Sequence, residues 1–129
     1  MSDSVLQRIL AAKREELAEA KRERPLGSFA AELTPSTRDF RGALAVPGRR
    51  YIFEVKKASP SRGVIRPDLD LDGLLELYER HADCISVLTD ERFFGGSADD
   101  LRRAHALTTR PLLRKDFTID AYQVAEARW

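Results

Sequence analysis

The chain contains very few of the side chains that build disulfides and metal centres. Its 129 residues include one cysteine, Cys84, and two histidines, His81 and His105. A single cysteine cannot form an intrachain disulfide, and it leaves no Cys-rich metal site. Cys84 lies in the apolar run Cys84–Leu88, so we interpret it as a small core residue rather than a nucleophile. Neither histidine has His, Asp or Glu partners at ligand spacing, so the sequence predicts no metal site.

Long apolar runs and an excess of one charge are also absent. No run approaches the ~18–20 apolar residues that span a bilayer, and the charged N-terminal segment has no signal-peptide core. Lys and Arg total 22 against 21 Asp and Glu, so no overall field favours nucleic acid or an anionic membrane. With 43% apolar residues the chain can build one folded domain. The sequence predicts a cytoplasmic protein without nucleic-acid or membrane partners.

Helical patterns fill residues 1–48, which we expect to form a helical N-terminal extension. Ser2 or Asp3 can cap a first helix that runs to about Arg24, and Pro25 then stops it. Two shorter helical segments are expected before a Pro-Gly pair ends the extension, over residues 26–33 and 37–44.

From residue 49 the pattern changes to strand, loop and helix, three times in succession. The expected strands cover Tyr51–Lys57, Cys84–Leu88 and Leu112–Lys115. The expected helices cover Leu69–Ala82, residues 98–107 after a Ser97 cap, and residues 121–129 after an Asp120 cap. Intervals of about thirty residues from strand to strand are typical of βαβ units and a parallel sheet.

Three such units favour an α/β fold of the (β/α)8, or TIM, barrel type, because no GxGxxG motif follows the first strand. A complete barrel of this type needs roughly 250 residues. We therefore expect residues 49–129 to form the first three βα units of an incomplete TIM barrel. On this interpretation the chain is the N-terminal half of a larger protein.

Polar groups stand at the ends of all three predicted strands, and lysines stand at the ends of the first and third. Glu54 and Lys56 are two residues apart, so both fall on one face of the first strand. Lys115 ends the third strand, and active sites form at the carboxyl ends of parallel strands. We expect the two lysines to converge, so that one can hold an anion, the other can act as a general acid, and Glu54 can orient either. The alternative is a set of structural ion pairs at the rim of the barrel.

Two aromatic residues and a serine-containing loop extend this candidate site. Phe94 and Phe117 follow the second and third strands and can wall an apolar, planar part of a ligand. The alternative for Phe94 is a turn over residues 93–96 whose aromatic rings fill the core. The loop Ser59–Gly63 can bind phosphate through Ser, Arg and backbone N–H groups, or it is simply a mobile loop.

Three motifs, in this order, resemble the signature of the indole-3-glycerol phosphate synthase family. They are Glu54–Gly63 (EVKKASPSRG), Ser86–Ser97 (SVLTDERFFGGS) and Leu113–Phe117 (LRKDF). The segments Pro25–Phe29 and Pro35–Phe40 are similar to those of enterobacterial-type members, in many of which the synthase is fused to phosphoribosylanthranilate isomerase. The resemblance covers nearly the whole chain. It also implies that the full-length protein can contain a fused isomerase domain.

The resemblance implies a lyase of tryptophan biosynthesis that needs no metal or organic cofactor. Its small phosphorylated substrate, 1-(o-carboxyphenylamino)-1-deoxyribulose 5-phosphate, closes to indole-3-glycerol phosphate with loss of carbon dioxide and water. Lys115 matches the general acid, Lys56 matches a lysine that binds anionic groups of the substrate, and Glu54 matches the glutamate that orients Lys56. The substrate-binding residues that the resemblance implies are Ser59, Phe94 and Phe117.

Other residues of this family, among them its general-base glutamate, belong to later strands. We therefore expect the 129-residue chain to be inactive or nearly so alone, and aggregation-prone or poorly packed unless it pairs with itself or with the missing half. Two alternatives remain open. One is an inactive half-barrel that serves only as a folding or assembly unit. The other is a different phosphate-binding barrel, such as phosphoribosylanthranilate isomerase, which would lack the set Glu54, Lys56 and Lys115.

Overall fold

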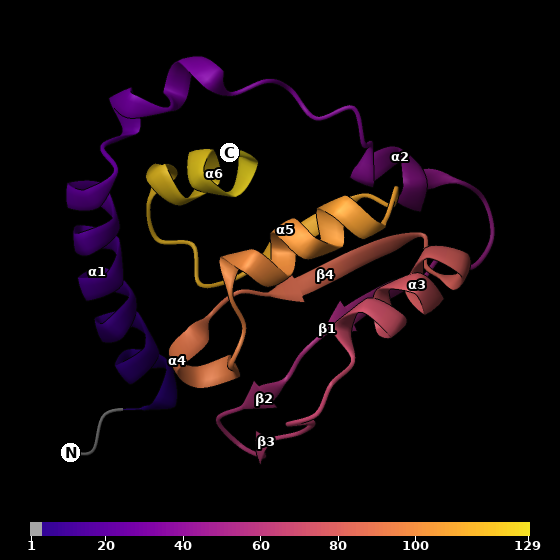
Figure 1. Ribbon diagram of the computed structural model, residues 1–129, viewed down its shortest axis with the longest axis horizontal. Coiled ribbons are helices and arrows are strands. Elements are labelled where there is room, and N and C mark those ends of the chain that lie inside the picture. The colour runs from indigo at the N-terminus through magenta and orange to yellow at the C-terminus, as the bar shows by residue number, and fades with distance from the viewer. Residues whose placement is uncertain (1–3) are drawn as a thin grey trace. The chain divides into compact units, whose positions relative to one another are not determined.

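The computed structural model describes residues 4–129 (Figure 1). These residues divide into two compact units. The terminal unit contains the residues up to Ser36 together with Phe117–Trp129, and the sheet unit contains Thr37–Asp116. The division into an extension over 1–48 and βα units over 49–129 stays a prediction from the sequence architecture.

Two α-helices and two short 3-10 helices form the terminal unit. Helix α1 covers Val5–Glu23 and helix α6 covers Ala121–Arg128. A capping box starts each of them: the side chain of Ser4 accepts from the backbone of Gln7, and Asp120 is the cap of α6 as expected. The caps expected for the first helix, Ser2 and Asp3, lie outside the described residues. The single helix expected over residues 26–33 is instead the pair η1 (Leu26–Ser28) and η2 (Ala30–Glu32).

Aromatic contacts hold the terminal unit together across about a hundred residues of sequence. The ring of Phe29, only 2% exposed, lies 5.9 Å from the ring of Tyr122 and 5.9 Å from that of Trp129. The Tyr122 hydroxyl donates toward the carbonyl oxygens of Ala20 and Arg24, at 3.1 and 3.0 Å. Burial of aromatic rings stabilises the packing, and the hydroxyl of Tyr122 adds hydrogen bonds to it. Helices α1 and α6 therefore belong to one packed unit (Figure 1).

A parallel sheet of three strands organises the sheet unit. The strands are β1 (Ile52–Val55), β4 (Cys84–Leu88) and β5 (Leu112–Lys115), in the order β1-β4-β5. The helices are α2 (Phe40–Ala45), α3 (Leu71–His81), α4 (Glu91–Phe94) and α5 (Ala98–Leu107). A small antiparallel hairpin, β2 (Ala58–Ser59) with β3 (Gly63–Val64), follows the first strand.

The second and third strands and the Ser97-capped helix match the sequence prediction, whereas the first strand is shorter than predicted. It ends at Val55 rather than Lys57. The reason is that the carbonyl oxygen of Lys57 accepts the N–H groups of Ile65 and Arg66, at 2.8 and 3.4 Å, and so closes the β2–β3 hairpin. Residues after Val55 therefore belong to the loop over the sheet and not to its ladder.

The hydrophobic core lies between the sheet and helices α3 and α5, which run side by side over one face (Figure 1). Val55, Ile85 and Val87 point to this face, and all three are at most 2% exposed. Alternate residues of the three strands point to the opposite face. There Ile52 and Leu113 on the outer strands are 47% and 45% exposed, whereas the residues of the central strand β4 are buried. The charged residues of the candidate site belong to this second, open face.

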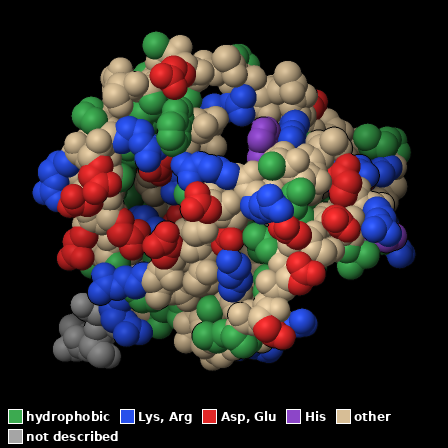
Figure 2. Space-filling view, viewed as in Figure 1, with side chains coloured by type: hydrophobic (Ala, Val, Ile, Leu, Met, Phe, Trp, Pro, Cys, Tyr) green, Lys and Arg blue, Asp and Glu red, His purple; other side chains and the backbone are tan. Residues whose placement is uncertain are grey.

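The surface mixes both signs of charge. Figure 2 shows basic and acidic side chains interspersed on the face in view, in keeping with 22 basic and 21 acidic residues. Within residues 4–129 no helix has the length and apolar character needed to cross a membrane.

Candidate active site

Glu54, Lys56 and Lys115 meet at the carboxyl end of the sheet. Glu54 is on β1, Lys56 directly follows this strand, and Lys115 is on β5, which does not pair with β1. Glu54 on β1 lies opposite Ser86 on β4, and Lys115 at the end of β5 lies opposite Leu88. Lys115 thus starts two residues further along the sheet, and its Nζ reaches back over β4 to ion-pair with Oε2 of Glu54. The Nζ of Lys56 lies 3.5 Å from the other oxygen, Oε1. One carboxylate therefore lies between two ammonium groups.

The surroundings of Glu54 favour its ionised form. Partial burial alone would raise the pKa of Glu54, but Lys115, by hydrogen bond and charge, and then Lys56 outweigh it and hold the pKa below its usual value. The Ser86 hydroxyl adds a longer contact to Oε2, at 3.4 Å. The two lysine side chains therefore hold Glu54 in its carboxylate form. The side chains of Lys115 and Lys56 remain 51% and 39% exposed, so both ammonium groups are accessible to an anionic ligand.

Ser59 lies on the β2–β3 hairpin, which begins two residues after Lys56 in the sequence. It belongs to β2, and its Oγ is 3.5 Å from Oγ of Ser61. The turn depends on Gly63, whose φ of +63° is readily adopted only without a Cβ atom. The hydroxyls of Ser59 and Ser61 thus share one ordered turn, and phosphate binding by this loop stays a prediction.

Phe94 ends the short helix α4, where the sequence is equally compatible with a simple turn. Asp90 caps this helix by accepting the N–H of Phe93 at 2.8 Å, and Gly95, with φ of +63°, ends it. A Cβ atom on Gly95 would lie 3.6 Å from Cβ of Ala58, so the end of α4 packs closely on β2. The ring of Phe94 is half-buried and does not fill the core, so part of it is accessible beside the hairpin that carries Ser59.

Phe117 belongs to the terminal unit and not to the sheet unit. It is half-buried, and its carbonyl oxygen accepts Nε2 of Gln123 at 3.0 Å, just before helix α6. Its contact with a ligand therefore stays a prediction. No group of three or more His, Cys, Asp or Glu side chains within residues 4–129 is arranged to hold a metal ion.

Two polar networks near the strand ends were missed by sequence reasoning. In the first, the Nζ of Lys57 donates to both carboxylate oxygens of Asp100, at 2.7 and 2.8 Å. In the second, Thr89 donates to Asp116 at 2.7 Å and accepts from Arg114 at 3.1 Å. Alternation along a strand indicates that Lys57 points away from Lys56, but nothing local in the sequence indicates Asp100 as its partner.

Comparison with known proteins gives a consistent match. The model of the family described as "Indole-3-glycerol phosphate synthase" matches residues 6–129. An indole-3-glycerol phosphate synthase from Dechloromonas aromatica is 49% identical over 99% of this chain and 51% of that protein. One from Laribacter hongkongensis is 51% identical, with the same coverage. The "Tryptophan biosynthesis protein TrpCF" of Vibrio parahaemolyticus is 46% identical over 96% of this chain and 26% of that protein.

These matches run through all three motifs that form the carboxyl end of the sheet. The chain spans about half the length of the synthases from Dechloromonas and Laribacter, and about a quarter of the longer TrpCF protein. The family match includes every residue of the Glu54, Lys56 and Lys115 cluster, as well as Ser59, Phe94 and Phe117. The chain therefore belongs to the indole-3-glycerol phosphate synthase family.

Proposed function

We propose that this chain supplies the N-terminal part of the active site of an indole-3-glycerol phosphate synthase. The substrate would be 1-(o-carboxyphenylamino)-1-deoxyribulose 5-phosphate, and the products indole-3-glycerol phosphate, carbon dioxide and water. The observation that carries the proposal is the position of Glu54 between Lys115 and Lys56 on the open face of the sheet. Family membership supports the same reaction.

Lys115 is proposed as the general acid. The aromatic carbon that bears the carboxylate attacks the ribulose carbonyl carbon, and the ammonium of Lys115 donates its proton to the carbonyl oxygen as the carbon–carbon bond forms. Loss of carbon dioxide then returns the electron pair to the ring, and loss of water completes the indole. Glu54 contributes by holding the Lys115 ammonium at the strand end through their ion pair.

Lys56 is proposed as an anion contact. The substrate carries a carboxylate and a phosphate, and Lys56, whose side chain is 39% exposed, presents its ammonium group beside Glu54. Ser59 and the half-buried ring of Phe94 come from neighbouring elements and are proposed to contact the substrate, with Phe117 as a further aromatic contact. A cytoplasmic location, which the sequence predicts, is part of the same proposal.

Half the length of the related synthases is absent from this chain, so we propose that it turns over no substrate alone. The alternative is a half-barrel that acts only as a folding or assembly unit, and the open face with exposed Ile52 and Leu113 favours it. The TrpCF relative supports a further possibility, an isomerase domain fused to the complete protein.

The test uses an extended chain, in which residues 1–129 are followed by the C-terminal half of the Dechloromonas aromatica relative. We expect it to form indole-3-glycerol phosphate, detected by indole fluorescence, and we expect Lys115→Met to lower kcat about 100-fold or more. Arg103→Met, which removes an exposed cation that ion-pairs with Asp72 on the helix side, is the matched control and should stay within about two-fold. An extended chain without turnover, or a Lys115→Met variant at normal rate, would overturn the proposal.

A further inference from the structure

Lys57 and Asp100 form a partly buried ion pair. The Lys57 ammonium lies 2.7 Å from Oδ1 and 2.8 Å from Oδ2 of Asp100, so it contacts both oxygens at once. The side chain of Asp100 is only 10% exposed and that of Lys57 is 32% exposed. By contrast, the ion pair of Arg103 with Asp72, which also ends on α5, has side chains 51% and 49% exposed. Removing one partner of the less exposed pair leaves a poorly hydrated charge behind.

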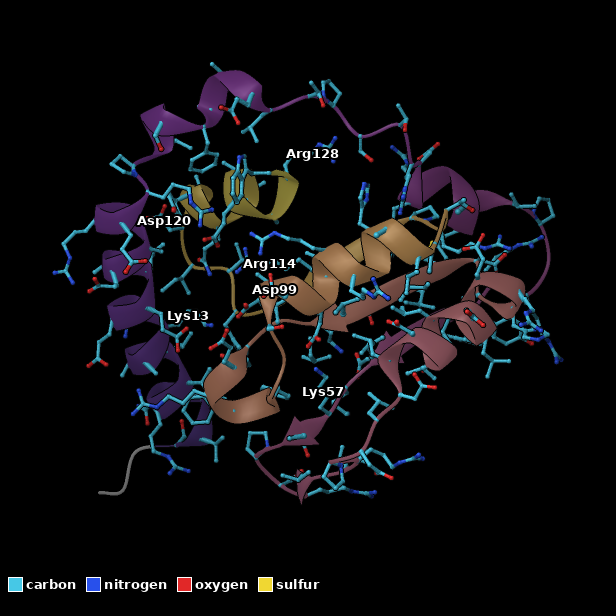
Figure 3. The ribbon with its side chains drawn as sticks, in the orientation of Figure 1. Lys13, Lys57, Asp99, Arg114, Asp120 and Arg128 are labelled. Atoms are coloured by element: carbon cyan, nitrogen blue, oxygen red, sulfur yellow. The ribbon has the colours of Figure 1, made fainter. Side chains whose placement is uncertain are left out.

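Asp100 is held in place by helix α5. It lies in the first turn of α5, and its own N–H donates to Oγ of the cap Ser97 at 3.1 Å. Helix α5 packs on β4 and β5 through the hydrophobic core, where Ala104 is fully buried. Figure 3 shows Lys57 between the hairpin and the start of α5, where Asp99 is also labelled. The ion pair therefore attaches the segment after β1 to the start of α5, a helix that contributes to the hydrophobic core.

The backbone of Lys57 connects this anchor to the candidate site. Its carbonyl oxygen accepts the N–H groups of Ile65 and Arg66 and thereby closes the hairpin that carries Ser59. A Cβ atom on Gly95 would lie 3.8 Å from Cβ of Lys57, so the end of α4 with Phe94 packs on the same residue. Lys56, which faces Glu54, is its immediate neighbour in the chain.

We propose that Lys57 and Asp100 are a positioning pair, which holds the hairpin and Lys56 in place at the carboxyl end of the sheet. The effect of this pair on kcat/KM rests on the proposed function, whereas its effect on the order of the hairpin does not. Neither residue touches the reacting atoms. Their part is to hold Ser59 and Lys56 in one arrangement, since displacement of contact groups by an ångström is costly to a reaction.

The experiment compares Asp100→Asn with the control Asp72→Asn in the extended chain. Each substitution removes one carboxylate charge from an ion pair that ends on α5, and asparagine keeps the shape of the aspartate side chain. We expect Asp100→Asn and Lys57→Met to lower kcat/KM about ten-fold or more, whereas Asp72→Asn stays within about two-fold. Lys57→Arg, which keeps the cation, should recover most of the activity.

Hydrogen exchange gives a readout independent of turnover. In Asp100→Asn the amides of Ile65 and Arg66 should exchange about ten-fold faster, while that of Ile85 in β4 stays unchanged. Faster exchange at all three would show general destabilisation and overturn the proposal, and so would unchanged exchange at Ile65 and Arg66. If the parent extended chain shows no turnover, the proposed function fails, but the exchange result still decides the positioning role.

Discussion

Glu54 determines the charge of the candidate site, because it is the carboxylate that both lysines contact. Its Oε2 ion-pairs with Lys115 and receives the Ser86 hydroxyl, and its Oε1 faces Lys56. The family resemblance implies a glutamate that orients Lys56, yet the closer partner here is Lys115. A single carboxylate can therefore fix the general acid and the anion contact relative to each other.

The pKa of Glu54 tests this arrangement directly. Burial raises the pKa of Glu54 and the two lysines lower it, with the lysines prevailing. Lys115→Met removes the larger of the two lysine contributions, so the pKa of Glu54 should rise. The pKa of Glu54 is measured in the parent chain and in Lys115→Met by following the carboxyl carbon signal of Glu54 by NMR as the pH is changed. An unchanged midpoint would show that Lys115 does not hold Glu54 in solution.

Gly96 is a second residue on which the site depends, for a steric reason. A Cβ atom at this position would lie 2.0 Å from the carbonyl oxygen of Leu88, a contact with backbone that cannot simply move away. We expect Gly96→Ala to lower the free energy of unfolding by about 3 kcal/mol or more. Gly27→Ala is the control, because a Cβ atom there meets nothing within 4 Å. Equal urea midpoints for the two variants would contradict the expectation.

At the scale of elements, the clearest sequence signals gave correct strands and helices. The continuous apolar run Cys84–Leu88 is β4, buried throughout, and Ser97 and Asp120 cap α5 and α6. The hairpin was missed because strands of two residues have no periodicity to recognise. The short helix α4 was missed for a similar reason: four residues between Asp90 and Gly95 fit a turn equally well. The local sequence does not distinguish a short hairpin from a loop, or a short helix from a turn, because long-range contacts determine which of them forms.

The junction between α3 and β4 depends on Asp83, which ties it to the start of β1. Its Oδ2 accepts the N–H of Tyr51 at 2.7 Å, and its Oδ1 accepts Nη1 of Arg50 at 3.2 Å. The hydrogen bond from the Tyr51 N–H has the largest effect on the pKa of Asp83 and lowers it. Burial opposes this effect and Arg50 adds to it, so that the pKa stays below its usual value. A carboxyl group with a lower pKa in the folded than in the unfolded state stabilises the fold above its unfolded pKa.

This stabilisation is lost as the pH falls through the lowered folded pKa. We therefore expect the difference in unfolding free energy between about pH 6 and pH 3 to be smaller in Asp83→Asn than in the parent. Urea unfolding at the two pH values measures it. Asp68→Asn, whose side chain is 83% exposed, controls for the loss of one carboxylate. A parent and an Asp83→Asn variant with equal pH dependence would rule out this role for Asp83.

For the whole molecule, the chain contains the first three βα units of a TIM barrel and spans about half of its curated synthase relatives. Composition and the thirty-residue rhythm were enough to predict that architecture. They could not predict that residues 117–129 group with the first 36 residues, because the aromatic contacts of Phe29 with Tyr122 and Trp129 leave no trace in local patterns.

The open face of the sheet leads to a prediction about association. Within residues 4–129, β1 and β5 each pair with one neighbour only, and Ile52 and Leu113 on these strands are 47% and 45% exposed. Unpaired strand edges beside exposed apolar side chains favour contact between chains. We expect the 129-residue chain to sediment as a concentration-dependent mixture, and the extended chain, whose added strands cover these edges, to do so much less.

Leu113→Lys distinguishes the open face from other surfaces. An added charge on an edge strand opposes pairing between chains, so this variant of the 129-residue chain should shift toward monomer. Val124→Lys on α6 replaces another exposed aliphatic side chain, 64% exposed, in the terminal unit, and should leave the association unchanged. Sedimentation velocity over a roughly hundred-fold range of concentration, about 1 to 100 μM, resolves the species. A parent chain that stays monomeric throughout, or a Val124→Lys variant that dissociates it equally, would exclude the open face as the surface of contact.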